Sequence, residues 1–200
     1  MKKWEKGIDF YAMGNEPSWA VDIDFEKGIK FHTMDGMEFN STHVNPIKAQ
    51  DANVSRIAAE TEAGSIIITI TEGDCNDTMS ENAFRNKVRV EVKSSKEEDY
   101  TTFEGCGNYV PDYRLHDIWV LEGLNGKTLK ADDFPKKELP RFELFVKEER
   151  LTGNAGCNTM NGSFYVAEKG ILHFGNMATT LMACENMEVE SVLGKALSNR

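Results

Sequence analysis

Residues 153–158, GNAGCN, combine two glycines, two asparagines and a cysteine that could do several kinds of chemistry. The glycines could cradle a phosphate, but a phosphate loop needs a following lysine and a helix, and here no lysine follows and a strand pattern comes next. Cys157 could act as a nucleophile if a base stabilised its thiolate. The candidate base, His173, alternates within a strand pattern, which is more typical of a structural residue. The stretch therefore predicts a bend rather than a catalytic loop.

The four cysteines are Cys75, Cys106, Cys157 and Cys184. None has the CxxC spacing that zinc sites usually use, which argues against structural zinc. One pair lies in the first two-thirds of the chain and one in the last third, and this placement favours two local disulfides. A Cys157–Cys184 bond would tie the bend to the start of a helix and stabilise by roughly 3–4 kcal/mol. The alternative is four buried, reduced thiols in a cytosolic protein.

The bend itself has the residues that a tight turn needs. Gly153 and Gly156 permit a close or positive-φ conformation. Asn154 and Asn158 can satisfy backbone groups of the loop.

A second set of possible ligands is HTMDGM, which places His32, Met34 and Met37 close together. Thioether and imidazole groups select Cu(I), so a copper site is an alternative hypothesis. The competing interpretation is that methionines fill the core. The carboxylates are plentiful, but they alternate along predicted strands and indicate solvated faces rather than a catalytic pair.

The elements that must position these residues are mostly β-strands. Residues 18–25, SWAVDIDF, alternate apolar and polar side chains, and the same period recurs in NKVRVEVK at 86–93. Residues 185–199 alone have the three/four spacing of a helix, with early glutamates and a later lysine. The fold class predicted is mainly β with a minor α part. Further strands are expected at 28–32, 65–71, 100–104, 118–121 and 141–146, with a hairpin turning at 169–170 between 163–168 and 171–175.

The strand pattern is interrupted at residues 107–117, GNYVPDYRLHD, which mix glycine, proline and polar groups. We place a domain boundary there. The sequence predicts two small antiparallel β-rich domains, at residues 1–110 and 115–200.

The formal net charge is −10 and the isoelectric point is about 5.0. This acidity argues against nucleic acid and against an anionic membrane surface as direct partners. The chain has no apolar run long enough to span a bilayer. The N-terminal MKKWEKGIDFYAMG has no apolar stretch after its lysines, so it is not a signal peptide as written. The protein is either cytosolic or lacks its targeting segment in this chain.

The C-terminal segments resemble the META domain of HslJ-like proteins. The similarity rests on LTGNAGCNTMNGSFYV followed by TTLMAC. It implies a small β-rich domain of bacterial envelope proteins, many of them lipoproteins, linked to stress tolerance and without catalytic residues. Such domains usually continue after the helix, so we expect the last strands to be missing here and a sheet edge to be open. The matching positions are Gly153, Gly156, Cys157, Asn158, Gly162, Tyr165, Thr180, Met182, Ala183 and Cys184.

The N-terminal part contains the segments FYAMGNEPSWAVDI, GDCNDTMSENAF and YTTFEGCG. With these segments it resembles a GNEPxW-type domain of uncharacterised bacterial lipoproteins, which often precedes a META domain. It marks a family without naming an activity. The matching positions are Gly14, Asn15, Glu16, Pro17, Trp19, Cys75, Asp77, Met79, Ser80, Gly105 and Cys106.

These motif residues have either a structural or a binding role. A Cys75–Cys106 disulfide fits the local pattern, since one cysteine precedes a loop-to-strand transition and the other ends the partner strand. Asn15, Glu16 and Pro17 predict a turn that leads to Trp19 as a core anchor, and Asp77 and Ser80 could cap a helical turn through MSENAF. The candidate binding surface consists of Asn15, Glu16, Asp77, Ser80, Asn154 and Asn158.

The two resemblances imply a non-catalytic protein of the bacterial cell envelope that binds a protein partner or a small ligand and contributes to envelope stress tolerance. We expect it in the periplasm or as an outer-membrane lipoprotein, with its signal segment absent from this chain and any membrane contact through a lipid anchor. No cofactor is expected.

Three alternatives remain. The first is a copper-binding stress protein, by analogy with envelope lipoproteins tied to copper stress. The second is an inhibitor of a wall-lytic enzyme such as lysozyme, a cationic target that an acidic surface would attract. The third is an enzyme.

Overall fold

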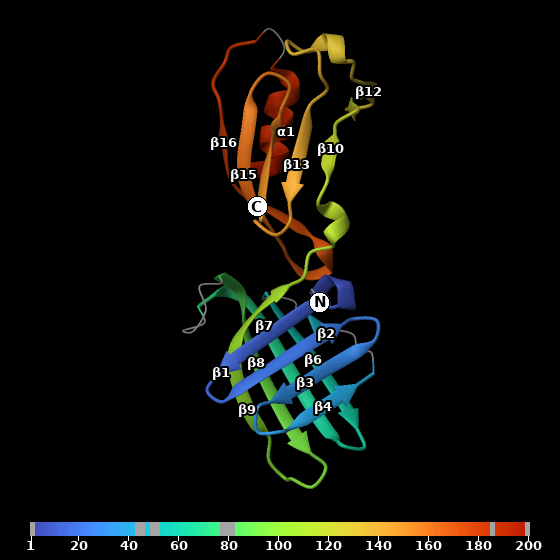
Figure 1. Cartoon of the computed structure of the whole chain (residues 1–200), viewed down its shortest axis with the longest axis vertical. Helices are drawn as coiled ribbons and strands as arrows, with labels where there is room; N and C mark the ends of the chain where they lie inside the picture. Colours follow the sequence, from blue (N-terminus) through green and yellow to red (C-terminus); the bar gives the residue numbers. More distant parts are fainter. Residues whose placement is uncertain (1–2, 43–46, 49–52, 77–82, 185–186, 199–200) are drawn as a thin grey trace. The chain divides into compact units, whose positions relative to one another are not determined.

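A computed structural model describes residues 3–42, 47–48, 53–76, 83–184 and 187–198. The chain divides into two compact units, Met1–Val110 and Pro111–Arg200. Both units are built from antiparallel strands, and α1 (Glu188–Ser198) is the single α-helix of the described residues (Figure 1). The predicted mainly β fold with a C-terminal helix is confirmed.

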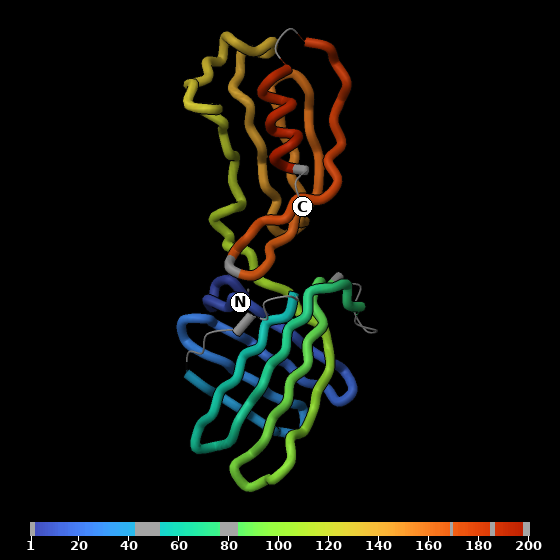
Figure 2. The backbone as a smooth tube through the Cα atoms, turned by 180° about the vertical axis from the view of Figure 1, so that it is seen from behind, coloured from blue at the N-terminus to red at the C-terminus, as the bar shows by residue number. Residues whose placement is uncertain are grey.

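Unit 1 contains one nine-stranded sheet with the strand order β4-β3-β2-β1-β9-β8-β7-β6-β5. The sheet folds over on itself, so that β1 to β4 form one layer and β6 to β9 another (Figure 2). A short 3-10 helix, η1 (Lys3–Lys6), precedes β1. The strands are β1 (Phe10–Asn15), β2 (Ser18–Asp24), β3 (Gly28–Thr33), β4 (Glu38–Ser41), β5 (Ile47–Lys48), β6 (Val54–Thr61), β7 (Gly64–Asn76), β8 (Ala83–Ser94) and β9 (Thr101–Tyr109).

The core of unit 1 lies between these two layers. Alternate residues of β2 are buried, as the period-two pattern predicts, and β7 and β8 follow the same rule. The aromatic ring of Phe31 on β3 packs against the ring of Phe103 on β9, with the two ring centroids 5.2 Å apart. The interior is therefore filled by apolar side chains from both layers, including Phe10, Trp19, Val21, Ile23, Phe31, Ile57, Ile66, Ile68, Ile70, Val88, Val90 and Phe103.

Unit 2 contains a five-stranded sheet in the order β10-β13-β14-β15-β16 and a separate β11–β12 hairpin. α1 lies against this sheet and contacts β16 (Figure 1). Leu144, Leu151 and Phe164 form the centre of its apolar core. The strands are β10 (Ile118–Val120), β11 (Gly123–Leu124), β12 (Lys127–Thr128), β13 (Arg141–Phe145), β14 (Arg150–Asn154), β15 (Thr159–Val166) and β16 (Leu172–Thr179), with 3-10 turns η2 (Tyr113–Leu115), η3 (Ala131–Asp133) and η4 (Glu168–Gly170).

Two segments differ from the sequence-based expectation. β9 continues through Tyr109, into the segment expected to be a linker, because it pairs with β1 and places Tyr109 opposite Phe10. The β15–β16 hairpin turns through η4 rather than through a two-residue turn, and Gly170 adopts a φ of 73°.

A close contact among three strands explains the glycine of the GNEPxW motif. Trp19 lies on β2, directly opposite Gly14 on β1, and its indole Nε1 donates a hydrogen bond to the carbonyl of Glu104 on β9, 3.2 Å away. A Cβ atom at position 14 would lie 2.2 Å from that nitrogen and 2.5 Å from the Glu104 oxygen. The indole can therefore cross β1 only where β1 has no side chain, which gives Gly14 and Trp19 a structural role.

Replacing Gly14 with alanine should destabilise unit 1 by roughly 1–3 kcal/mol, because the new methyl group must displace the buried indole or β9. Urea unfolding followed by tryptophan fluorescence measures this loss. Gly194→Ala in α1 is the control, since its Cβ would meet the nearest neighbour, Met160 Cε, at an ordinary 4.0 Å. That variant should be neutral or stabilised by up to about 1 kcal/mol. An unchanged midpoint for Gly14→Ala would contradict the crossing-indole account.

Candidate functional site

The GNAGCN segment forms a bend between β14 and β15, as the sequence predicts. The side-chain Oδ1 of Asn154 accepts a hydrogen bond from the backbone N–H of Gly156, 3.0 Å away. The backbone N–H of Ala155 donates to the carbonyl of Asn158 at 2.9 Å. Gly156 has a φ of 116°, a conformation that favours glycine. The bend is therefore held by its own asparagines, and Gly156 allows its shape.

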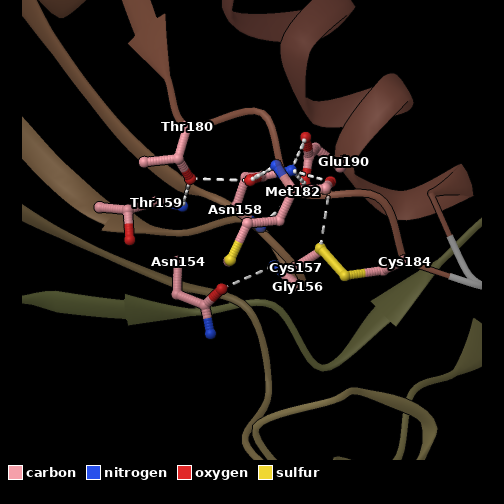
Figure 3. The surroundings of a disulfide bond; sticks show 9 residues. All are labelled: Asn154, Gly156, Cys157, Asn158, Thr159, Thr180, Met182, Cys184 and Glu190. Carbon is pink, nitrogen blue, oxygen red and sulfur yellow. Dashed lines mark hydrogen bonds between the residues drawn. A yellow bond between two sulfur atoms is a disulfide. The ribbon is translucent and has the colours of Figure 1, made fainter.

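The side chain of Asn158 joins the bend to the segment that follows β16 (Figure 3). Its Oδ1 accepts hydrogen bonds from the backbone N–H of Met182 at 2.8 Å and from the hydroxyl of Thr180 at 2.7 Å. Its Nδ2 donates to the Met182 carbonyl at 3.0 Å. Asn158 is 1% exposed, so these bonds form away from water, where an unpaired amide would be costly.

The same asparagine also joins the bend to α1. Its Nδ2 lies 2.9 Å and 3.1 Å from the two carboxylate oxygens of Glu190, and its backbone N–H donates to Oε2 at 3.0 Å. A carboxylate near a helix N-terminus is favourable in its own right. The Asn158 amide thus fixes three segments that are distant in the sequence.

A disulfide lies beside this amide. Cys157 and Cys184 are bonded, with a Cα–Cα separation of 6.2 Å and a separation of 27 positions in the sequence. In unit 1, Cys75 and Cys106 link β7 to β9, with a Cα–Cα separation of 5.6 Å. Both predicted disulfides are confirmed, although Cys106 lies within β9 rather than at its end.

The disulfides remove the basis for thiol chemistry at the bend. All four cysteines are paired, so Cys157 offers no thiolate for attack. The ring of His173 stacks on Tyr165 with centroids 5.0 Å apart. This contact between neighbouring strands gives His173 a structural role.

The candidate residues of unit 1 are less well connected. Asn15 ends β1, and its carbonyl accepts a hydrogen bond from the hydroxyl of Ser18 at 3.2 Å. Glu16 is exposed in the turn that leads to β2. Asp77 and Ser80 lie outside the described residues. The helical turn expected through MSENAF is replaced at its last two residues, 83 and 84, by the start of β8.

The structure does not gather the three residues proposed for copper. His32 is exposed on β3, between the buried positions 31 and 33. Met34 is 87% exposed, whereas Met37 packs against the core of unit 1. His32 and Met37 therefore lie on opposite faces of the sheet. Among the described residues, no group of three or more histidines, cysteines, aspartates and glutamates is placed to hold a metal ion.

Sequence reasoning missed the role of Glu190. It was expected merely as one of the early glutamates that suit the helix dipole, and its partner Asn158 is 32 residues away. Thr180 and Met182 were recognised as motif positions, without a function. The structure shows that both hold the Asn158 side chain.

A comparison with protein families identifies the second unit. Residues 113–200 match the META domain. The match spans the bend, the Asn158 contacts, the Cys157–Cys184 disulfide and α1, so the polar contacts that hold the unit together all lie within the matched residues. No curated protein and no solved structure gave a match. Within the described residues, no helix has the length and apolar character to cross a membrane.

Replacing Asn158 with aspartate should destabilise the META domain by about 2–4 kcal/mol at neutral pH. The change removes the Nδ2 donor and places a second carboxylate against Glu190 in a buried site. The deficit should shrink as the pH falls, because protonation removes the repulsion that exists in the folded state. Asn176→Asp, an exposed change on β16, is the matched control. Thermal unfolding between pH 4 and 8 tests this, and an equal, pH-independent effect of both variants would refute it.

Proposed function

We propose that the protein is a non-catalytic binding protein of the bacterial cell envelope, which holds a protein partner or a small ligand and contributes to envelope stress tolerance. The observation that carries the proposal is that each unit is closed by its own disulfide. Structural disulfides persist in oxidising compartments and are rare in the reducing cytosol. Export is therefore the setting in which both bonds form and last.

A non-catalytic role is supported by what the polar residues of the bend do. The side-chain amide of Asn158 donates hydrogen bonds to the Met182 carbonyl and the Glu190 carboxylate, and it accepts one from the Thr180 hydroxyl. Asn154 holds the backbone of the bend itself. The Asn158 amide and the Asn154 Oδ1 are therefore used by the fold. The remaining group, the Asn154 Nδ2, is a buried amide donor without a hydrogen-bond partner among the described residues and is not a nucleophile or base.

The envelope location is supported by the two resemblances. HslJ-like META proteins and GNEPxW-type domains both occur in bacterial envelope lipoproteins. We propose an HslJ-like second unit and a GNEPxW-type first unit, in the periplasm or attached to the outer membrane through a lipid anchor outside this chain. The anchor would be the main contact with the membrane, since the net charge of −10 opposes adsorption to anionic lipid.

A protein partner is supported by the edge strand β10. Its residues Ile118, Trp119 and Val120 are 53%, 50% and 49% exposed. Exposed apolar side chains on an edge strand are typical of surfaces that receive another chain.

The oxidation state of the cysteines in the cell tests the export proposal. Cells that produce the full-length protein are quenched in acid, free thiols are alkylated under denaturant, and the cysteine peptides are identified by mass. We expect the Cys75–Cys106 and Cys157–Cys184 peptides to be linked and to come from the envelope fraction. A Cys157→Ser/Cys184→Ser variant should retain the first link alone and lose roughly 3–4 kcal/mol of stability in unit 2. Free thiols in a cytosolic fraction would overturn the proposal.

A screen of the pure protein against hydrolase substrates tests the non-catalytic part of the proposal. We expect no turnover above a heat-denatured control. Turnover that copurifies with the folded protein through two chromatographic steps would contradict it.

A further inference from the structure

Unit 1 has a hollow of about 130 Å³ on the outer side of β2, β3 and β4, at the end where η1 approaches the sheet. Asp22, Lys30 and Asn40 lie directly opposite one another on the three strands, so their side chains share one face. Lys6 of η1 completes the rim. The volume is well below the roughly 300–1,000 Å³ of pockets for drug-sized ligands, so the hollow fits a small molecule or one group of a larger one.

The two carboxylates of the hollow are already occupied. Asp24 accepts hydrogen bonds from the ammonium group of Lys27 at 2.8 Å and from the backbone N–H groups of Glu26 and Lys27, both at 3.0 Å. Burial raises the pKa of Asp24, but these hydrogen bonds outweigh it and hold the pKa below its ordinary value. Asp22 binds the ammonium group of Lys3. A cation would have to displace both lysines, so the hollow is poorly suited to one.

The groups that remain available are donors. In the described parts of the chain, the side chains of Lys6, Lys30 and Asn40 make no hydrogen bond or ion pair, although the backbones of Lys30 and Asn40 belong to the sheet. This is notable in a chain with 33 acidic and 23 basic residues, where a carboxylate partner is easily supplied. The two ammonium groups and the amide thus place three donors around a partly apolar hollow, beside the carboxylates of Asp22 and Asp24, which Lys3 and Lys27 neutralise.

The floor of the hollow is held in place by close backbone contacts. Gly28 has a φ of 119°, and a Cβ atom there would lie 2.0 Å from the carbonyl oxygen of Ser41. The Asp24–Lys27 turn beside it is fixed by the hydrogen bonds described above. The backbone of β3 and β4, which carries Lys30 and Asn40, therefore needs no rearrangement when a ligand binds, and ordering of the exposed side chains is the main conformational cost.

We propose that this hollow binds a compact oxyanion, a phosphate group or a carboxylate, through the ammonium groups of Lys6 and Lys30 with Asn40 as an amide donor. The proposal rests on the function proposed above and names the chemical class of the small ligand. Charge-assisted hydrogen bonds from lysine to an oxyanion are short and strong. Screening by salt should weaken the binding.

Titrations of the ¹⁵N-labelled full chain with inorganic phosphate and with acetate, at constant ionic strength, test the site. We expect saturable shifts confined to the amides around Asp22, Gly28 and Asn40. Lys6→Gln and Lys30→Gln should each weaken binding roughly tenfold, and the double variant should abolish it. Lys96→Gln, on the turn between β8 and β9, is the matched control and should bind as the unchanged protein does.

The outcomes separate the two sources of the oxyanion. Saturation by phosphate alone assigns a phosphate group, saturation by acetate alone assigns a carboxylate, and saturation by both supports the shared chemistry. The proposal is overturned if neither probe gives local, saturable shifts, or if the shifts persist in a folded double variant. A negative result here leaves the cysteine test of export untouched, because that test does not involve the hollow.

Discussion

The buried amide of Asn158 is the contact on which the META domain depends. Its side chain makes hydrogen bonds to Thr180 and Met182, which follow β16, and to Glu190 of α1. The neighbouring Cys157–Cys184 bond makes the same connection covalently. The hydrogen bonds of the amide stabilise the folded state, whereas the disulfide lowers the conformational entropy of the unfolded chain. Their contributions to the stability of the domain are therefore separate.

In unit 1, an aromatic side chain connects segments that are distant in the sequence. The indole of Trp19 crosses β1 to reach β9, the place where the last strand of the unit returns to pair with the first. Because this pairing is the one in the sheet that joins strands far apart in sequence, its closure carries the largest loss of chain entropy. The Cys75–Cys106 bond also holds β9, through β7. The single non-local junction is thus secured from both sides.

The strongly alternating strands were predictable from the sequence, and the reason is physical. β2 places large apolar residues at its inward positions 19, 21 and 23, and β8 does so at 88, 90 and 92, which produces the period-two signal. β1 does not, because its inward positions include Ala12 and Gly14, and the space above them belongs to the indole of Trp19. β6 buries Ser55, and β14 buries Leu151 alone. These segments form strands because they pair with neighbouring strands. Their own sequences lack a clear alternation of apolar and polar residues, so they could not be predicted from periodicity.

The candidate site was predictable to a similar degree. The bend, its glycine and the disulfides follow from local residue types. The partnership of Asn158 with Glu190 does not, because hydrogen bonds between residues 32 positions apart leave no trace in spacing. That the side chains of Lys6 and Lys30 have no partner among the described residues could not be predicted either, because five acidic residues lie between Lys6 and Lys27 in the sequence.

Net charge and local charge lead to different conclusions about what this protein binds. Some of the acidic residues have a structural role. Asp9 accepts a hydrogen bond from the backbone N–H of Phe25 at 2.7 Å, and Glu190 accepts one from the backbone N–H of Asn158 in the bend. Carboxylates used in this way are satisfied within the fold and contribute little to recognition at close range. The overall charge of −10 still repels polyanions at a distance. A small anion that reaches Lys6 and Lys30 meets two ammonium groups that have no ion-pair partner among the described residues. The carboxylates that line the same hollow, Asp22 and Asp24, are paired with Lys3 and Lys27. Specificity for a ligand therefore depends on which charges the fold leaves uncompensated, and the sum over the sequence does not determine it.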